Sequence, residues 1–77
     1  MTHTPDFHFD RDLSTDKWSI EIDTAAQYGC IERKADGLGG GLWFEGRTLV
    51  DYDGVSELPR SVCDALRAGG FDLGDCE

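Results

Sequence analysis

KWSIEID, residues 17–23, is the stretch that decides the fold of this 77-residue chain. Its apolar residues Trp18, Ile20 and Ile22 alternate with polar ones, and side chains two residues apart on a strand lie on the same face. One apolar and one polar face are typical of an antiparallel sheet that is covered on one side only. The segment therefore predicts a strand with one face on a core and the other in water.

The segments on either side of it predict two more strands. YGCIERK at 28–34 predicts a second strand, in which the side chains of Tyr28, Cys30 and Glu32 lie on one face. FHFD at 7–10 alternates in the same way and predicts a short strand with both phenylalanines facing inward. Polar and glycine-rich composition predicts a turn at 11–16 and a flexible loop at 35–41.

LWFE at 42–45 and TLVDY at 48–52 predict a hairpin with two possible registers. A two-residue turn at Gly46-Arg47 pairs Phe44 with Leu49 and Trp43 with Val50. A three-residue loop instead puts on one face Leu42, Phe44 and Val50, and on the other Trp43, Glu45, Leu49 and Asp51. We favour the three-residue loop because it makes both strands amphipathic. Trp43 is then a partly exposed aromatic side chain surrounded by acidic ones.

The remaining chain predicts one helix at about residues 57–68, with Pro59 in its first turn and Gly69 or Gly70 after its end. Phe71 and Leu73 are expected to fold back onto the core. The predicted core consists of Trp18, Ile20, Ile22, Ile31, Phe44, Val50, Leu58, Val62 and Leu66. We expect one α+β domain over residues 1–77, with three to four antiparallel strands and one helix on one face. Residues 1–6 are expected to form a loose arm and 74–77 a frayed tail.

Charge is the main functional signal, because the chain carries 16 acidic and 7 basic residues, for a net charge of −9. This excess disfavours direct contact with nucleic acid, since phosphate binding needs Lys and Arg. It also disfavours an anionic membrane surface. It favours a partner protein with a basic surface.

The acidic residues gather in two segments, residues 1–16 with a net charge of −3 and residues 35–57 with a net charge of −4. Whether the two segments meet in one face is not decided by their positions in the chain. The candidate partner-binding residues are Asp10, Asp12, Asp16, Glu21, Asp23, Trp43, Glu45, Asp51, Asp53 and Glu57. Glu21 with Asp23, and Glu45 with Asp51, are candidates for carboxylate rows that imitate phosphates, because alternate residues of a strand repeat at about 6.5–7 Å.

No motif predicts catalysis, a metal or a cofactor. His3, Asp6, His8 and Asp10 match no compact zinc spacing. Asp51-Tyr52-Asp53-Gly54 begins like a calcium loop but lacks the later glycine and glutamate of an EF-hand. The glycines at 37–41 are not followed by the Lys-Ser/Thr of a phosphate loop. We therefore expect a protein that is not an enzyme and needs no cofactor.

The three cysteines, Cys30, Cys63 and Cys76, are odd in number and far apart in the chain. This usage, without a signal peptide or a long apolar run, predicts a reducing cytoplasm, no disulfide framework and no membrane span. Cys30 and Cys63 fit core positions, and Cys76 is expected to be exposed.

An otherwise unremarkable acidic domain of unknown partner, whose charge serves solubility, is consistent with these features. Two specific binding functions are consistent with them as well. One is an inhibitor that occupies the nucleic-acid-binding surface of another protein by imitating DNA. The other is a small adaptor or subunit that uses Trp43 and Tyr52 as anchors within an acidic rim.

In size, acidity and layout the whole chain resembles the small anti-CRISPR proteins of phages that mimic DNA. That class shares no common motif or fold, so no residue role is transferred from it. The resemblance implies a monomer or homodimer without a cofactor, acting in the cytoplasm of a bacterial host. It also implies a target such as a CRISPR surveillance complex with a basic DNA-binding cleft.

Overall fold

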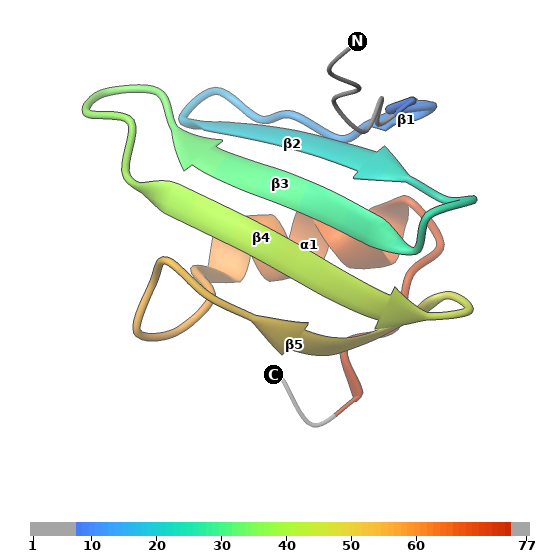
Figure 1. Cartoon of the computed structure of the whole chain (residues 1–77). Coiled ribbons are helices and arrows are strands. Elements are labelled where there is room, and N and C mark those ends of the chain that lie inside the picture. Colours follow the sequence, from blue (N-terminus) through green and yellow to red (C-terminus); the bar gives the residue numbers. More distant parts are fainter. Residues whose placement is uncertain (1–7, 75–77) are drawn as a thin grey trace, which may run out of the picture.

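The computed structural model describes residues 8–74 as an antiparallel sheet of five strands with one helix behind it (Figure 1). The strands follow the chain across the sheet in the order β1-β2-β3-β4-β5. Their bounds are β1 Arg11–Asp12, β2 Trp18–Asp23, β3 Tyr28–Arg33, β4 Gly39–Glu45 and β5 Thr48–Tyr52, and the helix α1 spans Arg60–Ala68. The α+β class is confirmed, with more strands than the three to four expected.

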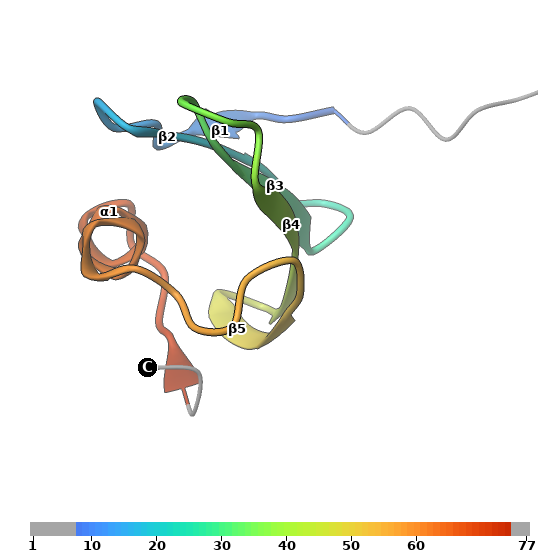
Figure 2. The same cartoon turned by 90° about the vertical axis from the view of Figure 1, so that its left-hand side faces the viewer.

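The central strands are those that the alternating patterns predict. Ile20 of β2 is paired with Ile31 of β3, so that both side chains lie on the face covered by α1. Tyr28, Cys30 and Glu32 fall on the other face of β3, which carries no helix. Figure 2 shows the sheet curving around the helix, so that the apolar face forms the concave side. We call the uncovered side the open face.

The β4–β5 hairpin differs from the favoured register. The turn is the two-residue one, with Gly46 at a φ of 62°, and Phe44 is paired with Leu49. A shift in register then follows between Trp43 and Phe44, so that Trp43 is paired with Asp51 and Val50 has no partner in the register. The prediction of Val50 as core is therefore wrong, because this bulge residue is 46% exposed, and Leu49 is fully buried in its place.

The N-terminal strand lies later in the chain than predicted. Residues 8–10 form no strand, whereas Arg11–Asp12, expected in a turn, pair with β2 as β1. Two further backbone hydrogen bonds continue this pairing, from Leu13 N to Ile20 O and from Thr15 N to Trp18 O. Phe9 is half-buried, and Phe7 lies outside the described residues, as do the arm at 1–6 and the tail at 75–77.

The glycine-rich stretch is also more regular than expected, because β4 begins at Gly39 rather than after Gly41. A Cβ added at Gly39 would overlap the carbonyl oxygen of Ile31 on the neighbouring strand. These glycines therefore let two backbones approach closely, which is one of the uses of glycine within a strand.

The helix starts at Arg60, three residues later than expected, because Pro59 holds the preceding position in an extended conformation. A residue before proline avoids helical geometry, so Leu58 also stays outside. The inner stripe holds Val62, Cys63 and Leu66, all buried. The predicted burial of Cys63 is confirmed, whereas Cys30 is only half-buried and Cys76 lies outside the described residues.

The segment after the helix returns to the sheet, as predicted. Phe71 and Leu73 are buried, and Asp72 forms a parallel bridge with Thr48 at the edge of β5. Two arginines hold the end of the helix beside this segment. Arg11 donates to the Gly69 carbonyl, and Arg47 donates to the carbonyls of Gly69 and Gly70. Both guanidinium groups lie over the Phe71 ring.

Within the described chain, no helix has the length and apolar character needed to span a membrane.

Candidate functional site

The open face of the sheet carries most of the predicted contact residues. Strand pairing sets Asp12 beside Glu21 and Glu21 beside Cys30, and the next row sets Tyr28 beside Trp43 and Trp43 beside Asp51. Side chains of directly paired residues are about 4.5–5.5 Å apart at Cβ. The face therefore combines an aromatic centre with carboxylates on both sides of it.

The aromatic centre is formed by Tyr28 of β3 and Trp43 of β4. Their ring centroids are 5.4 Å apart and the ring planes are inclined by 65°, a favourable edge-to-face arrangement. Trp43 remains 39% exposed, in agreement with its predicted partial exposure. The Trp43–Tyr28 pair thus presents an indole to solvent in a defined orientation.

Gly41 provides the space for both rings. A Cβ at this position would lie 2.9 Å from Trp43 Cη2 and 3.0 Å from the Tyr28 hydroxyl oxygen, closer than real Cβ contacts allow. The indole of Trp43 therefore extends back along β4, over Gly41, instead of standing away from the sheet. Any larger residue at position 41 would push at least one of the rings outward.

Asp53 closes one side of this cluster. Its Oδ1 accepts a hydrogen bond from the Gly41 N–H at 2.7 Å, and its own N–H donates to the Gly41 carbonyl at 3.1 Å. The Cys30 sulfur lies 3.7 Å from the Tyr28 hydroxyl oxygen. The interaction with the Cys30 side chain, burial and the nearby Asp53 carboxylate all raise the pKa of the Tyr28 hydroxyl. Tyr28 is thus a neutral phenol at physiological pH.

Among the described residues, the strands formed by the two acidic segments are not neighbours in the sheet. The first contributes β1 and the second contributes β4 and β5, which lie at opposite sides of the sheet because the strands follow chain order. Glu21 and Glu32 occupy the face between these strands and belong to residues 17–34, which have a net charge of zero. Carboxylates therefore extend across the open face instead of forming a single cluster.

Not all of the predicted acidic residues are available on this face. Asp23 is only 6% exposed, because its carboxylate accepts hydrogen bonds from the N–H groups of His8 and Ala26. The expected row of Glu21 with Asp23 is therefore wrong, since Asp23 has a structural role at the end of β2. Asp10 is exposed, but its carboxylate accepts hydrogen bonds from the hydroxyl and the N–H of Thr24. These two bonds lower the pKa of the Asp10 carboxyl group.

Asp16 and Glu57 lie away from the open face. Asp16 lines a hollow together with Ser61 of the helix, and Glu57 lines another beside Arg60. Both hollows are on the helix side of the molecule. Asp16 and Glu57 were predicted to share a surface with the other acidic residues only because they are close to them in the sequence.

Tyr52 does not act as the second anchor on the open face. It is paired with Leu42 and packs, half-buried, against the core under the helix. The bulge at Val50 reverses the alternation along β5, so that Leu49 and Tyr52 both face inward. Tyr28 takes the place expected of Tyr52, and the alternation of Tyr28, Cys30 and Glu32 was the available signal for it.

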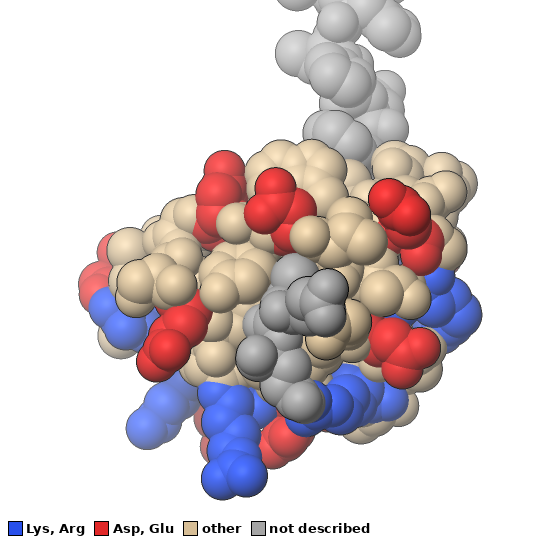
Figure 3. Space-filling view, turned by 90° about the horizontal axis from the view of Figure 1, so that it is seen from below, with Lys and Arg blue, Asp and Glu red and all other residues tan. Residues whose placement is uncertain are grey.

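Basic side chains gather on the other side of the molecule. In Figure 3 the blue side chains in view lie toward the helix, whereas the part toward the open face carries red ones. Arg60 and Arg67 lie on the helix itself, and Arg11 and Arg47 bind its C-terminal carbonyls. Lys17 and Lys34 flank one end of the sheet, just outside β2 and β3. The described arginines thus lie away from the open face, whereas acidic residues occur on both sides of the molecule.

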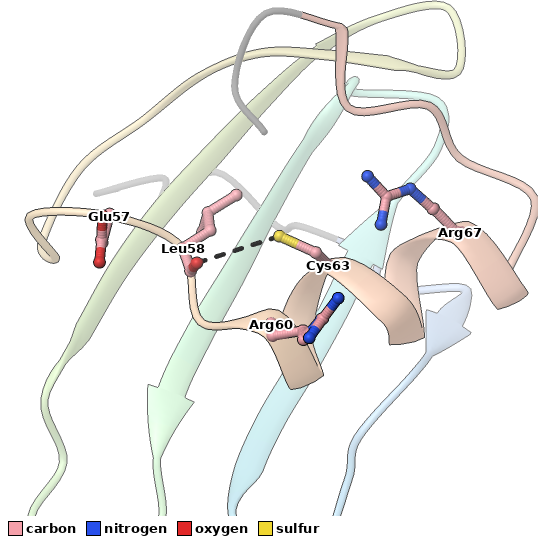
Figure 4. A pocket seen from close by; sticks show the side chains of 5 residues that line it. All are labelled: Glu57, Leu58, Arg60, Cys63 and Arg67. Carbon is pink, nitrogen blue, oxygen red and sulfur yellow. Dashed lines mark hydrogen bonds between the residues drawn. The ribbon is translucent and has the colours of Figure 1, made fainter.

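A hollow of about 500 Å³ beside the helix is the other feature with reactive groups (Figure 4). Arg60 and Arg67 project on either side of Cys63, whose thiol faces the Leu58 carbonyl at 4.0 Å. Burial raises the pKa of this thiol, which keeps it protonated and a poor nucleophile. The hollow does not assemble a nucleophile with a base.

The described residues contain no group of three or more His, Cys, Asp or Glu side chains placed to hold a metal ion. His3 and Asp6, considered above with His8 and Asp10, lie outside the described residues.

No protein-family model, curated protein or solved structure matches this chain.

Proposed function

We propose that this chain is a non-enzymatic binding protein whose open sheet face docks onto a basic surface of a partner protein. The observation that carries the proposal is the exposed indole of Trp43, paired with Asp51 and standing in an acidic face whose opposite side holds the arginines. A partly exposed aromatic side chain with a charged rim is typical of the centre of a protein interface.

Electrostatics supports a basic partner. Glu21, Glu32 and Glu45 are exposed, and their carboxylates form no ion pair or hydrogen bond with the described residues. Their charge is thus available to attract a basic surface and to accelerate association with it. Because these side chains project from paired strands, much of their spacing is set before binding, which lowers the ordering cost.

Inhibition by DNA mimicry is the narrower form of this proposal. The carboxylates extend across several strands, which are about 4.8 Å apart, and could thereby follow a row of phosphate sites on a basic cleft. Under this form the target is a DNA-binding protein such as a CRISPR surveillance complex, as the anti-CRISPR resemblance implies. The loss of Asp23 from the expected row and the central indole favour the broader form, an adaptor with an aromatic anchor.

The test compares two double variants with the same change in net charge. Glu21→Lys/Glu45→Lys reverses charge on the open face, and Glu57→Lys/Asp64→Lys does so on the helix side. Tagged wild type and both variants are used to capture proteins from bacterial lysate at low and at high salt, and captured proteins are identified by mass spectrometry. We expect a basic protein that is captured at low salt by wild type and the helix-side variant only.

Equal capture by the two double variants would contradict the proposal, because the face would then not matter. Competition with double-stranded DNA separates its two forms. DNA that displaces the chain from the captured partner supports mimicry, and a complex that is indifferent to DNA supports the adaptor.

A further inference from the structure

Trp18 has a cationic side chain stacked on its ring, and the exposed indole of Trp43 has none among the described residues. Trp18 is 6% exposed and carries the guanidinium of Arg33 at 6.0 Å from its ring centroid, while Phe71 carries those of Arg11 and Arg47. No described Lys or Arg lies over Trp43. Arginine side chains of the chain itself thus lie over Trp18 and Phe71, whereas the exposed indole of Trp43 has no described cation on it.

The position of the indole fits a flat ligand. Trp43 Cη2 lies beside Gly41, within 2.9 Å of where a Cβ would stand, and the side chain is still 39% exposed, so the indole rests on the sheet and keeps part of its surface in solvent. The inclined Tyr28 ring, 5.4 Å away, limits rotation of the indole. A planar group can therefore stack on the outer side without first ordering the tryptophan.

Carboxylates next to the indole supply the charge. Asp51 is the direct cross-strand partner of Trp43, and only its Oδ1 is engaged, by the Tyr52 N–H at 2.8 Å. Its Oδ2 accepts no hydrogen bond from the described residues. Asp53 adds a second negative charge beside Tyr28.

We infer that the Trp43 indole receives one arginine side chain of the partner, with Asp51 accepting its N–H groups. The inference rests on the proposed function and names the chemistry at its centre. A guanidinium is planar, stacks on indole and donates along its edge to a carboxylate, whereas an ammonium is a compact charge without a stacking surface. The site should therefore prefer arginine to lysine, which a uniform acidic face would not do.

The probes are capped hexa-arginine and hexa-lysine peptides, which carry the same charge, and capped hexa-citrulline, which keeps the shape of arginine without its charge. Each is titrated into the ¹⁵N-labelled full chain at low salt. We expect hexa-arginine to bind at least about fivefold more tightly than hexa-lysine, with the largest shift at the Trp43 indole N–H, and hexa-citrulline to bind far more weakly. Nuclear Overhauser effects between arginine δ-methylene protons and the indole of wild type give a readout that needs no variant.

Two variants remove the stacking surface without changing charge. Trp43→Leu deletes the ring, and Gly41→Ala displaces it, because the new Cβ would meet Trp43 and Tyr28. Each should lower the affinity for hexa-arginine about fivefold, to the level of hexa-lysine, while Leu38→Ala, an exposed apolar position outside the cluster, should change nothing.

The outcomes separate this inference from the proposed function. Equal affinity for both cationic peptides, unchanged by Trp43→Leu, would overturn the arginine site but leave a basic docking face intact. Shifts confined to the helix side, or no binding by either cationic peptide, would overturn both.

Discussion

Trp43 and Asp51 are cross-strand partners on the open face because one residue, Val50, is left out of the pairing between β4 and β5. Without this bulge, a two-residue turn would place Trp43 opposite Val50. The extra residue brings a carboxylate next to the indole and turns Leu49 and Tyr52 toward the core together. One irregularity in the sheet thus determines both the composition of the binding face and part of the core.

Deletion of Val50 should cost little stability, because it removes the bulge and keeps the inward residues in place. Once Val50 is absent, Leu49 and Tyr52 are two residues apart, as side chains on one face of a regular strand must be, and Trp43 stays opposite Asp51. We expect a loss of about 1 kcal/mol or less. Leu49→Ala removes a fully buried side chain of the same strand and should cost about 2–5 kcal/mol. Urea unfolding of both variants measures the difference, and a deletion as damaging as Leu49→Ala would show that the bulge itself stabilises the sheet.

The two tryptophans should separate folding from binding. Trp18→Ala removes a buried ring from the core and should lower the free energy of unfolding by about 3–5 kcal/mol, enough to unfold many small domains. Trp43→Ala removes an exposed ring and should have a much smaller effect, about 1 kcal/mol. Thermal unfolding followed by circular dichroism tests this pair. A collapse of the melting temperature in Trp43→Ala would place that ring in the core and remove it as an anchor.

Arg47 should stabilise the fold although its side chain is exposed. Its guanidinium donates to Gly70 at 2.8 Å and to Gly69 at 3.1 Å, and lies 4.8 Å from the centroid of Phe71. Arg47→Lys cannot reproduce this forked donation and stacking, so we expect a loss of about 1–2 kcal/mol. Arg60→Lys, on the exposed side of the helix, is the matched control and should be neutral. Equal unfolding midpoints for the two variants would contradict a specific role for Arg47.

Asp36 should give the fold a distinct dependence on acid. Arg33 donates two hydrogen bonds to its carboxylate, at 2.6 and 3.0 Å, and these bonds, with one from the Leu38 N–H, lower its pKa from 3.8 to about 2. Because the folded pKa is below the unfolded one, the contribution to stability is present above about pH 4 and is lost as the pH falls toward 2.

The melting temperature of Asp36→Asn should therefore lie below that of wild type at pH 6, and the gap should close toward pH 2. Asp16→Asn, at an exposed position without a hydrogen bond in the described chain, controls for the removal of a charge. Carboxyl NMR of wild type provides the direct check, and an Asp36 midpoint near 3.8 would exclude the proposed ion-pair effect.

Several elements could be predicted because their cause is local. Trp18, Ile20 and Ile22 show the two-residue period of a half-buried strand, and Val62 and Leu66 lie on one side of a helix. The return of Phe71 and Leu73 to the core follows from two large apolar residues after a glycine helix end. The weaker predictions concerned segments whose pattern was short or mixed, such as FHFD and the glycines before Leu42.

By itself, the sequence determined the alternating faces of the strands, the single helix and the excess of negative charge. Only the tertiary structure decided that the strands of the two acidic segments stand on opposite sides of the sheet. It also decided that the Asp23 carboxylate accepts backbone N–H groups and that Tyr28 rather than Tyr52 accompanies Trp43. Alternation is a property of neighbouring residues, so it can be read along the chain. Strand order, the bulge and hydrogen bonds between distant residues arise from packing the whole chain at once, and these features place the charges around the indole.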